Sequence, residues 1–113
     1  MKDAFISIVV IPIDGPPYVR SIRNELKPMQ KVVGGYIDRV MYPIDGVNYD
    51  IILNDEGLMV DNPVMNPIFC QLPGDVFVTK PNLDTGEWES LNLEDELRVM
   101  AHLKGLDHKQ EKA

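Results

Sequence analysis

The stretch MQKVVGGYI, residues 29–37, marks the sharpest change of local structure along this chain of 113 residues. Glycine adopts positive φ without a Cβ clash, so Gly34 and Gly35 can end a helix within one residue. The β-branched and aromatic residues from Tyr36 to Tyr42 favour a strand. The stretch therefore predicts a helix that ends at Val33 and is followed at once by a strand.

Upstream of this stretch, the sequence predicts a hairpin and the start of the helix. Residues 4–11 are almost continuously apolar, which indicates a central strand buried on both faces. A proline- and glycine-rich turn over 12–17 leads to a second strand over 18–22. Asn24 is a suitable N-cap, and Leu26, Met29 and Val33 have the spacing of one helical face.

Downstream, further strands are expected over 48–53, 58–60, 75–80 and 88–90. The acidic turn Asn54-Asp55-Glu56-Gly57 would join the first two as a hairpin, with Gly57 at the position that demands positive φ. A last helix is capped by Asn92 and Asp95 in a capping-box arrangement and is expected to end near Gly105.

These elements predict an α+β fold with a mainly antiparallel sheet of about five to six strands. Two short helices, the second C-terminal, are expected on one side of the sheet. Residues 1–106 would form a single globular domain, and residues 107–113 a polar C-terminal tail that frays.

The composition limits the classes of function. The net charge of −7 disfavours general binding to nucleic acid, whose phosphates an acidic surface repels. The single cysteine, Cys70, fits a reducing compartment, and the apolar run of residues 4–13 is too short for a membrane span. A cytoplasmic location in a bacterial host is expected, without membrane association.

No catalytic motif is recognisable. The two histidines, His102 and His108, lie six residues apart and form no spaced ligand set, so no cofactor or metal is expected. An enzyme remains an alternative only through Asp55, Glu56 and Asp75, whose oxygens suit a divalent cation. A solvated turn explains the first two carboxylates better, and the sequence favours a non-enzymatic protein.

The only concentration of basic residues is a candidate site for a small anionic ligand such as a nucleotide. It consists of Arg20, Arg23, Lys27 and Lys31, of which the two lysines share a helical face. Tyr18 or Tyr36 would supply a stacking surface for the ligand. Solvated charges that balance neighbouring acids are the simpler explanation.

A second candidate site is a polar pocket lined by Tyr36, Asn54, Asn62 and Asn66. Asparagines in proline-constrained turns also satisfy local backbone groups, which is the simpler explanation. Trp88 is a candidate anchor for a partner, and otherwise covers the edge of the core.

Several of these features together resemble one family of small phage, plasmid and bacterial proteins, the domain-of-unknown-function family three-eight-four-six. The resemblance extends from the first strand to about Leu91. It is carried by the double-glycine segment and following strand, by the pairs Asn62-Pro63 and Asn66-Pro67, and by Gly74-Asp75-Val76. It implies a fold but no established activity.

The resemblance and the lack of a catalytic set favour an accessory protein of a phage or other mobile element. Such a protein would act by binding a protein partner, and an acidic surface would speed its encounter with a basic one. Sequestration of a nucleotide-like anion and a metal-dependent reaction are the alternatives. Exposed strand edges and the pairs Val64-Met65 and Ile68-Phe69 are also compatible with a homodimer.

Overall fold

An antiparallel sheet is the framework of the computed structural model, which describes residues 4–111. Its path has the order β2-β1-β5-β4-β3, and a short β6 pairs with β5 off that path. The strands are β1 (Phe5–Ile11), β2 (Tyr18–Arg23), β3 (Ile37–Met41), β4 (Asp50–Asn54), β5 (Val76–Pro81) and β6 (Trp88–Glu89). The predicted α+β class and the antiparallel sheet are confirmed.

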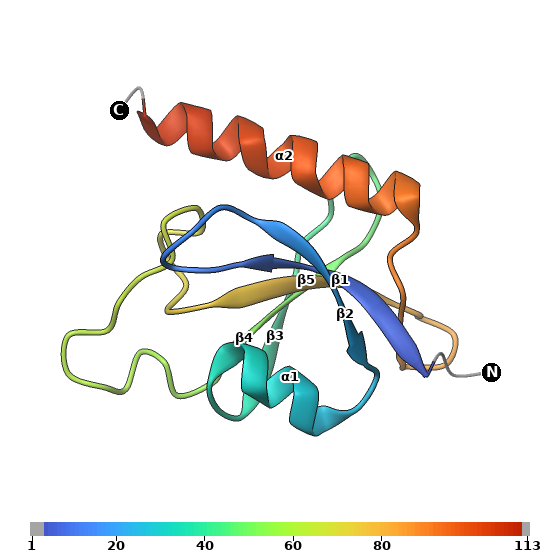
Figure 1. The fold of residues 1–113 in the computed structure, drawn as a ribbon, viewed down its shortest axis with the longest axis horizontal. Helices are drawn as coiled ribbons and strands as arrows, with labels where there is room; N and C mark the ends of the chain where they lie inside the picture. The colour runs from blue at the N-terminus through green and yellow to red at the C-terminus, as the bar shows by residue number, and fades with distance from the viewer. Residues whose placement is uncertain (1–3, 112–113) are drawn as a thin grey trace.

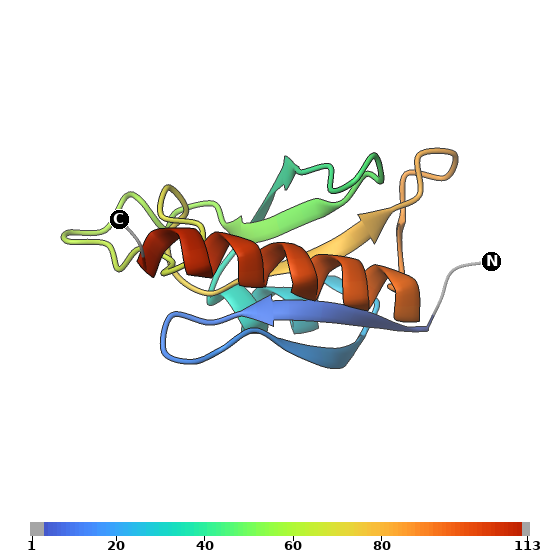
Figure 2. The same ribbon diagram turned by 90° about the horizontal axis from the view of Figure 1, so that it is seen from above.

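The two helices cover opposite faces of the sheet. Figure 1 shows α1 (Leu26–Val33) on one side and α2 (Leu93–Glu111) on the other. Figure 2, turned by 90°, shows α2 lying over the sheet and running roughly alongside β1. The expectation that both helices lie on one side is wrong. The inner strands β1, β4 and β5 carry apolar side chains on both faces, and each face must be covered to exclude water.

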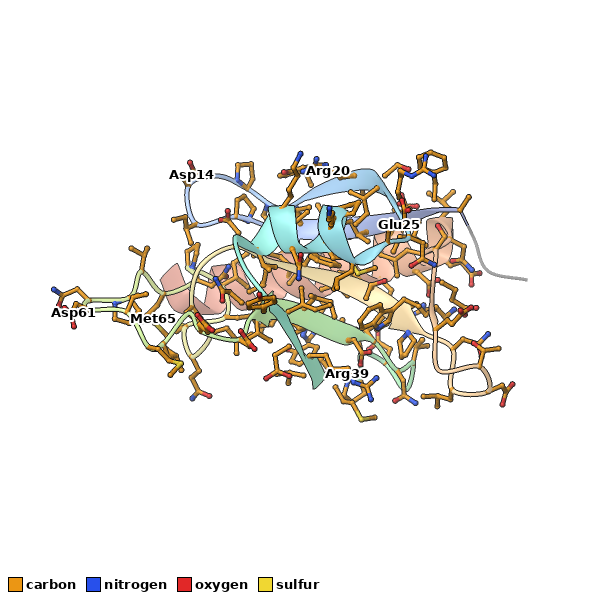
Figure 3. The ribbon with its side chains drawn as sticks, turned by 90° about the horizontal axis from the view of Figure 1, so that it is seen from below. Asp14, Arg20, Glu25, Arg39, Asp61 and Met65 are labelled. Carbon is orange, nitrogen blue, oxygen red and sulfur yellow. The ribbon has the colours of Figure 1, made fainter. Side chains whose placement is uncertain are left out.

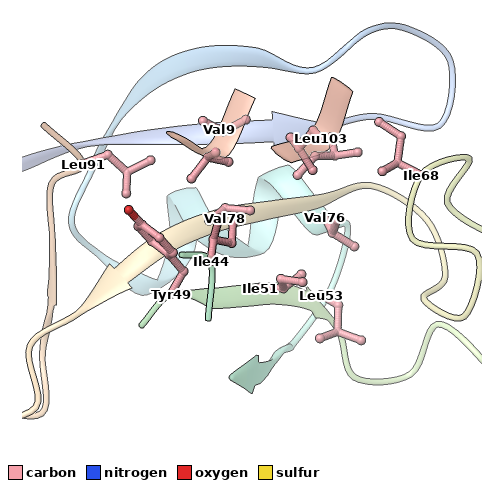
Figure 4. Close-up of a cluster of buried hydrophobic side chains, with 12 residues drawn as sticks. Val9, Ile44, Tyr49, Ile51, Leu53, Ile68, Val76, Val78, Leu91 and Leu103 are labelled. Carbon is pink, nitrogen blue, oxygen red and sulfur yellow. The ribbon is translucent and has the colours of Figure 1, made fainter. Parts of the chain in front are cut away.

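Each face has its own hydrophobic cluster, and β1 contributes to both. Val9 and Ile11 lie in the cluster under α2, whereas Ile8 and Val10 lie in the cluster under α1. This alternation confirms the predicted strand, which is buried on both faces. Figure 4 shows the cluster under α2, where Val78 of β5 lies between Val9 and Ile51. The sheet is therefore the shared middle layer of two cores.

The start of α1 differs from the prediction. Asn24 is not the N-cap: Glu25 holds that position without a side-chain hydrogen bond to the helix. Asn24 is buried instead, and its Nδ2 donates to the carbonyl of Trp88 at 3.0 Å. Leu26 is exposed, and the buried face consists of Met29, Val32 and Val33. A bond to β6, which lies far along the chain, thus replaces a local cap.

The end of α1 is as predicted. Gly34 is the C-cap with φ of 84°, in the left-handed region that glycine adopts without strain. The amides of Gly34 and Gly35 both donate to the carbonyl of Gln30, at 2.7 and 3.1 Å. The glycine pair is thus a helix stop. Gly35 has a second role, because a Cβ there would lie 2.8 Å from Nδ2 of Asn54.

The acidic turn forms, but the strand expected after it does not. Gly57 N–H donates to Asn54 O at 3.1 Å, which closes the turn. Residues 58–60, by contrast, are turn and bend rather than strand. Gly57 does not have positive φ. It is needed because a Cβ would come within 2.5 Å of the Pro73 ring.

The C-terminal helix is longer than expected. Asn92 and Asp95 form the predicted capping box, with Asp95 N donating to Asn92 Oδ1 at 2.8 Å and Asn92 N to Asp95 Oδ2 at 3.0 Å. The helix continues through Gly105 to Glu111 instead of ending near Gly105. Residues 107–111 of the expected tail are therefore helical, and residues 112–113 lie outside the described residues.

Candidate functional site

The segment between the acidic turn and β5 projects from one end of the molecule. We call residues 58–64 the apical loop. Figures 1 and 2 both show this yellow-green segment extending beyond the helices and the sheet. In the side-chain view of Figure 3, Asp61 lies at the outermost end of the labelled residues. The loop is therefore presented to solvent on all sides.

The apical loop carries apolar side chains that are exposed to solvent, although side chains of this kind are usually buried. Met59 is 81% exposed, and three further residues are also mostly exposed: Leu58, Val60 and Val64. Single exposed apolar residues are normal on a protein surface, but a run of three at the tip of a projecting loop is not. This loop is the most conspicuous candidate for contact with another molecule.

The base of the apical loop is clamped against Pro73. On one side Gly57 packs closely on the Pro73 ring. On the other side Met65 forms an isolated bridge with Pro73, and Gly74 N–H donates to Val64 O at 2.7 Å. Both ends of the loop thus meet the same residues before β5, so the tip projects from a fixed base.

Asn66 holds the segment that follows the loop. It is 1% exposed, and its Nδ2 donates to Ile11 O at 2.9 Å and to Gly74 O at 3.0 Å. Its Oδ1 accepts from the amides of Ile68 and Phe69, both at 3.0 Å. Both donors and both acceptor positions of the amide are used. Asn66 is therefore structural and has no capacity left for a ligand.

The other three residues of the predicted polar pocket have separate roles. Asn54 lies against Gly35, and its Oδ1 accepts from Glu56 N–H at 2.9 Å within the turn. Asn62 is exposed with φ of 52°, a left-handed conformation that asparagine tolerates better than most residues. Tyr36 is exposed at the start of β3. The structure does not bring the four predicted residues into one pocket.

A second candidate lies on the α1 face of the sheet. A hollow of about 450 Å³ is bounded by the end of α1, the β1–β2 hairpin and the start of β5. We call it the basic pocket; its charged and aromatic lining consists of Asp14, Tyr18, Arg20, Lys31 and Asp75. Two of the four predicted basic residues, from β2 and α1, thus meet at one site, together with a predicted stacking tyrosine.

The other two basic residues lie elsewhere. Arg23 donates to Glu25 at 2.6 Å, and its guanidinium lies 5.3 Å from the centre of the Phe5 ring. Lys27 is exposed on α1, one turn before Lys31, and does not line the pocket. Of the four basic residues proposed from the sequence, Arg20 and Lys31 share this hollow, whereas Arg23 and Lys27 do not line it.

Trp88 covers the edge of the core. It is partly buried against the cluster under α1, and its Nε1 donates to Asp50 Oδ2 at 2.8 Å. Asp50 is fully buried, and Arg39 pairs with the same oxygen at 3.3 Å. The indole therefore packs against the protein itself and does not project into solvent as an anchor for a partner.

The N-terminus of α2 is tied to the sheet by a buried charged network centred on Asp95. The carboxylate accepts from the Tyr49 hydroxyl at 2.6 Å and pairs with Lys80 and Arg98 at 3.3 and 3.2 Å. Burial raises the pKa of Asp95, but the bonds from Tyr49, the Asn92 amide and Lys80 outweigh it and hold the pKa below its ordinary value. The network fixes the helix in place.

A histidine–tyrosine pair lies beside a further hollow. Tyr42 OH and His102 Nε2 are 2.7 Å apart. Burial raises the pKa of Tyr42. The neighbouring hollow of about 360 Å³ is lined mainly by apolar side chains, with Cys70 and Gln71 at its wall. The pair links α2 to the segment after β3.

No helix among residues 4–111 is both long and apolar enough to cross a membrane. Comparison with known families gives one match: the chain matches DUF3846, described as a domain of unknown function, over residues 6–104. The chain belongs to the DUF3846 family. No curated protein and no solved structure matches it.

The DUF3846 match includes both candidate sites. The apical loop and every lining residue of the basic pocket lie within residues 6–104. The family resemblance that the sequence suggests is thereby confirmed. Its two Asn-Pro segments lie in the apical loop and at the base of the loop. For this DUF3846 protein, the family assignment supplies a fold-level relationship without an activity.

The acidic residues proposed as metal ligands do not come together. Asp55 and Glu56 are exposed in their turn, whereas Asp75 accepts from Ile13 N–H at 2.8 Å next to the β1–β2 hairpin. Across the described part of the chain, no group of three or more His, Cys, Asp or Glu residues could hold a metal ion. No observation therefore favours a metal-dependent reaction.

Three features of the structure differ from or go beyond what the sequence predicts. The apolar triplet of residues 58–60 suggests a strand, although a Gly before it and an Asp-Asn-Pro after it leave little room for one. Asp14 is expected only in a turn, but it lines the basic pocket. The burial of Asp50 has a signal in the sequence, because a charged residue followed by Ile51, Ile52 and Leu53 must find a partner.

Proposed function

We propose that this protein is a non-enzymatic accessory protein of a phage or other mobile element, acting in the bacterial cytoplasm by binding a protein partner through its apical loop. One observation carries the proposal: three consecutive apolar side chains, Leu58, Met59 and Val60, are exposed at the tip of a loop with a clamped base. Fixed apolar anchors lose little conformational entropy on binding. The mobile-element origin follows from the resemblance to a family of small phage, plasmid and bacterial proteins that the sequence suggests, and the single cysteine fits the compartment.

The charge around the loop indicates the chemistry of the partner. Between Arg39 and Lys80 the chain has no lysine or arginine but six carboxylates, three of which flank the loop: Asp55, Glu56 and Asp61. These three are exposed. The partner surface is therefore an apolar pocket bordered by lysine and arginine residues. The apolar tip supplies affinity and the acidic flanks speed the encounter.

The interior of the protein supports a binding role as well. Its buried carboxylates, Asp50 and Asp95, are engaged with Trp88 and with the cap of α2, respectively. Asn66 uses its whole amide for backbone contacts. These bonds help to hold the scaffold that presents the loop, whereas among the described residues Asp50 Oδ1 and Thr79 Oγ1 are buried without a hydrogen-bond partner.

Site-specific photocrosslinking tests the proposal. A photoreactive residue at position 59 is compared with one at position 97, where Leu97 is equally apolar and mostly exposed but lies on α2. In lysate of the bacterial host, we expect a small set of proteins to crosslink from position 59 and not from position 97. Raising the salt concentration should reduce the yield, because exposed charges are then screened.

The candidate partner is then purified and its affinity measured. The variant Leu58→Ser/Met59→Ser/Val60→Ser should weaken binding by about thirtyfold or more, since several apolar side chains would no longer be buried. The matched variant Leu93→Ser/Leu97→Ser, which changes exposed residues of α2, should leave the affinity unchanged. The same crosslinked proteins from both positions, or equal effects of both variants, would contradict the role of the loop.

The structure also favours one of the two alternatives derived from the sequence. The convergence of Arg20, Lys31 and Tyr18 on the basic pocket supports binding of a small nucleotide-like anion as a second function. The two functions use different surfaces, so one protein can have both of them, and both can be regulated together.

A further inference from the structure

The basic pocket is formed by three successive segments, the β1–β2 hairpin, β2 and α1, together with the distant Asp75. Tyr18 and Arg20 come from β2, and their register partners Val10 and Ile8 place both on the α1 face of the sheet. Lys31 comes from the last turn of α1. The β1–β2 hairpin supplies the opposite wall with Pro12, Asp14 and Pro16. Figure 3, which views the molecule from the α1 side, shows Asp14 on this hairpin and Arg20 further along the same edge.

The cations of this pocket lack protein partners. Within residues 4–106, whose side chains are placed, neither Arg20 nor Lys31 makes an ion pair or a side-chain hydrogen bond, although Asp14 and Asp75 line the same hollow. Arg23, by contrast, pairs with Glu25 at 2.6 Å. The side chains of Arg20 and Lys31 are both exposed at the hollow, so their donors are free to bind an anion that enters it.

The volume of the basic pocket and its remaining lining residues limit the class of ligand that it can bind. A volume of about 450 Å³ lies within the range of small-molecule sites. Tyr18 is partly exposed at the hollow and can stack on a planar ring. Asp14 is an exposed carboxylate that can accept hydrogen bonds from hydroxyl groups. Asp75 is already held by Ile13 N–H and forms part of the wall.

We propose that the basic pocket binds a nucleoside monophosphate. Arg20 and Lys31 hold the phosphate, Tyr18 stacks on the base, and Asp14 accepts from the ribose hydroxyls. The planar guanidinium of Arg20 can donate two parallel hydrogen bonds to phosphate oxygens, and Lys31 adds a point charge. The carboxylates Asp14 and Asp75 disfavour a more highly charged di- or triphosphate in the same space.

This inference deepens the second function proposed above, binding of a small nucleotide-like anion, and rests on it, but it is independent of the apical loop. The lining of the basic pocket includes no residue of the loop. Loss of nucleotide binding would therefore leave the proposed protein interaction intact, and a failed crosslinking experiment would leave the pocket unaffected.

Titration followed by two-dimensional NMR of the ¹⁵N-labelled chain tests the proposal. The probes are adenosine monophosphate, ribose 5-phosphate, adenosine and inorganic phosphate, each up to about 10 mM. We expect the monophosphate to shift amide signals around Tyr18, Arg20 and Lys31. Ribose 5-phosphate should bind more weakly than the monophosphate, and adenosine more weakly by about tenfold or more, because it lacks the group held by the cations.

Two lysines of the same helix provide a matched pair of variants. Lys31→Gln should weaken binding of the monophosphate by about tenfold, whereas Lys27→Gln, one turn earlier and outside the pocket, should leave it unchanged. Arg20→Gln should act like Lys31→Gln. Tyr18→Leu should weaken binding of the monophosphate but not of inorganic phosphate. Far-ultraviolet circular dichroism confirms that each variant is folded.

Three results would overturn the proposal. The first is an absence of shifts around the pocket at the highest monophosphate concentration. The second is equal weakening by Lys27→Gln and Lys31→Gln, which would show non-specific attraction of an anion to the surface. The third is equal affinity for adenosine and adenosine monophosphate, which would remove the cations from recognition.

Discussion

At the scale of single residues, Asn66 is the clearest case of a polar side chain on which the fold depends. Its amide makes four hydrogen bonds to backbone groups of three segments, and the residue is buried. Asn66→Ala should lower the free energy of unfolding by about 3 kcal/mol, because buried backbone donors and acceptors would lose their partners. Urea unfolding followed by circular dichroism measures the change.

Asn62 offers the matched control for this prediction. It lies in the same Asn-Pro region but is exposed, with φ of 52°. Asn62→Gly should change the free energy of unfolding by less than about 0.5 kcal/mol. Glycine adopts this conformation freely, which favours the folded state, but it also gains entropy in the unfolded chain, which opposes that gain. Similar losses in both variants would show that Asn66 acts only through its turn and not through its buried amide.

Asp95 makes stability depend on pH. Its pKa is below the ordinary value of 3.8 in the folded protein, so the carboxylate contributes stability that is present above that value and is lost as the pH falls through the folded pKa. Asp95→Asn should cost about 3 kcal/mol at pH 7, because Lys80 and Arg98 lose a buried partner.

The pH dependence separates this electrostatic role from simple packing. Urea unfolding at pH 7 and near pH 3 should show a smaller difference between wild type and Asp95→Asn in acid, because below the ordinary pKa of 3.8 the carboxylate of the unfolded wild-type chain takes up a proton. A difference that is the same at both pH values would refute the electrostatic account.

At the scale of the elements, two glycines with different backbone conformations test how the helices end. Gly34 ends α1 with φ of 84°, whereas Gly105 lies inside α2 without positive φ and with open space where a Cβ would be. Gly34→Ala should destabilise the protein by about 1 kcal/mol, and Gly105→Ala should stabilise it by up to about 1 kcal/mol. Thermal unfolding of the two variants checks the opposite signs.

Gly105→Ala is also decisive for the length of α2. Alanine stabilises a helix interior but gives no such gain at a helix end that needs the left-handed conformation. Destabilisation by this substitution would therefore mean that the helix stops near Gly105, as the sequence suggested, and does not continue to Glu111.

At the scale of the whole molecule, one sheet is shared by two cores. Met29 lies in the cluster under α1 and Leu103 in the cluster under α2, and β1 contributes to both. Met29→Ala and Leu103→Ala should each lower stability by about 3 kcal/mol, as expected for cavities in a packed core. Because the middle layer is common, each variant should still unfold in one cooperative transition.

Trp88 provides the measurement for this prediction. It is the only tryptophan and lies at the edge of the cluster under α1. Its fluorescence should follow the same urea transition as the far-ultraviolet circular dichroism signal in Leu103→Ala, although the substituted residue lies on the opposite face. Two separated transitions in this variant would show that the faces unfold independently.

The sequence by itself determined the features that depend on neighbouring residues. Positive φ at Gly34, the capping box of Asn92 and Asp95, and the two-sided burial of residues 5–11 follow from backbone sterics, short-range hydrogen bonds and the strand period of two. These local causes were enough for the fold class and, with the Asn-Pro and glycine motifs, for the family.

Only the tertiary structure decided the features that depend on distant residues. Asn66 binds Ile11 and Asn24 binds Trp88 over sequence separations of 55 and 64 residues, so neither acts as its neighbours suggested. Arg20 and Lys31 share a hollow while Lys27 does not, since the position of α1 over β2 selects which cations meet. Residues 58–60 have strand-forming side chains but no neighbouring strand, because the sheet ends before them and leaves them exposed on the apical loop.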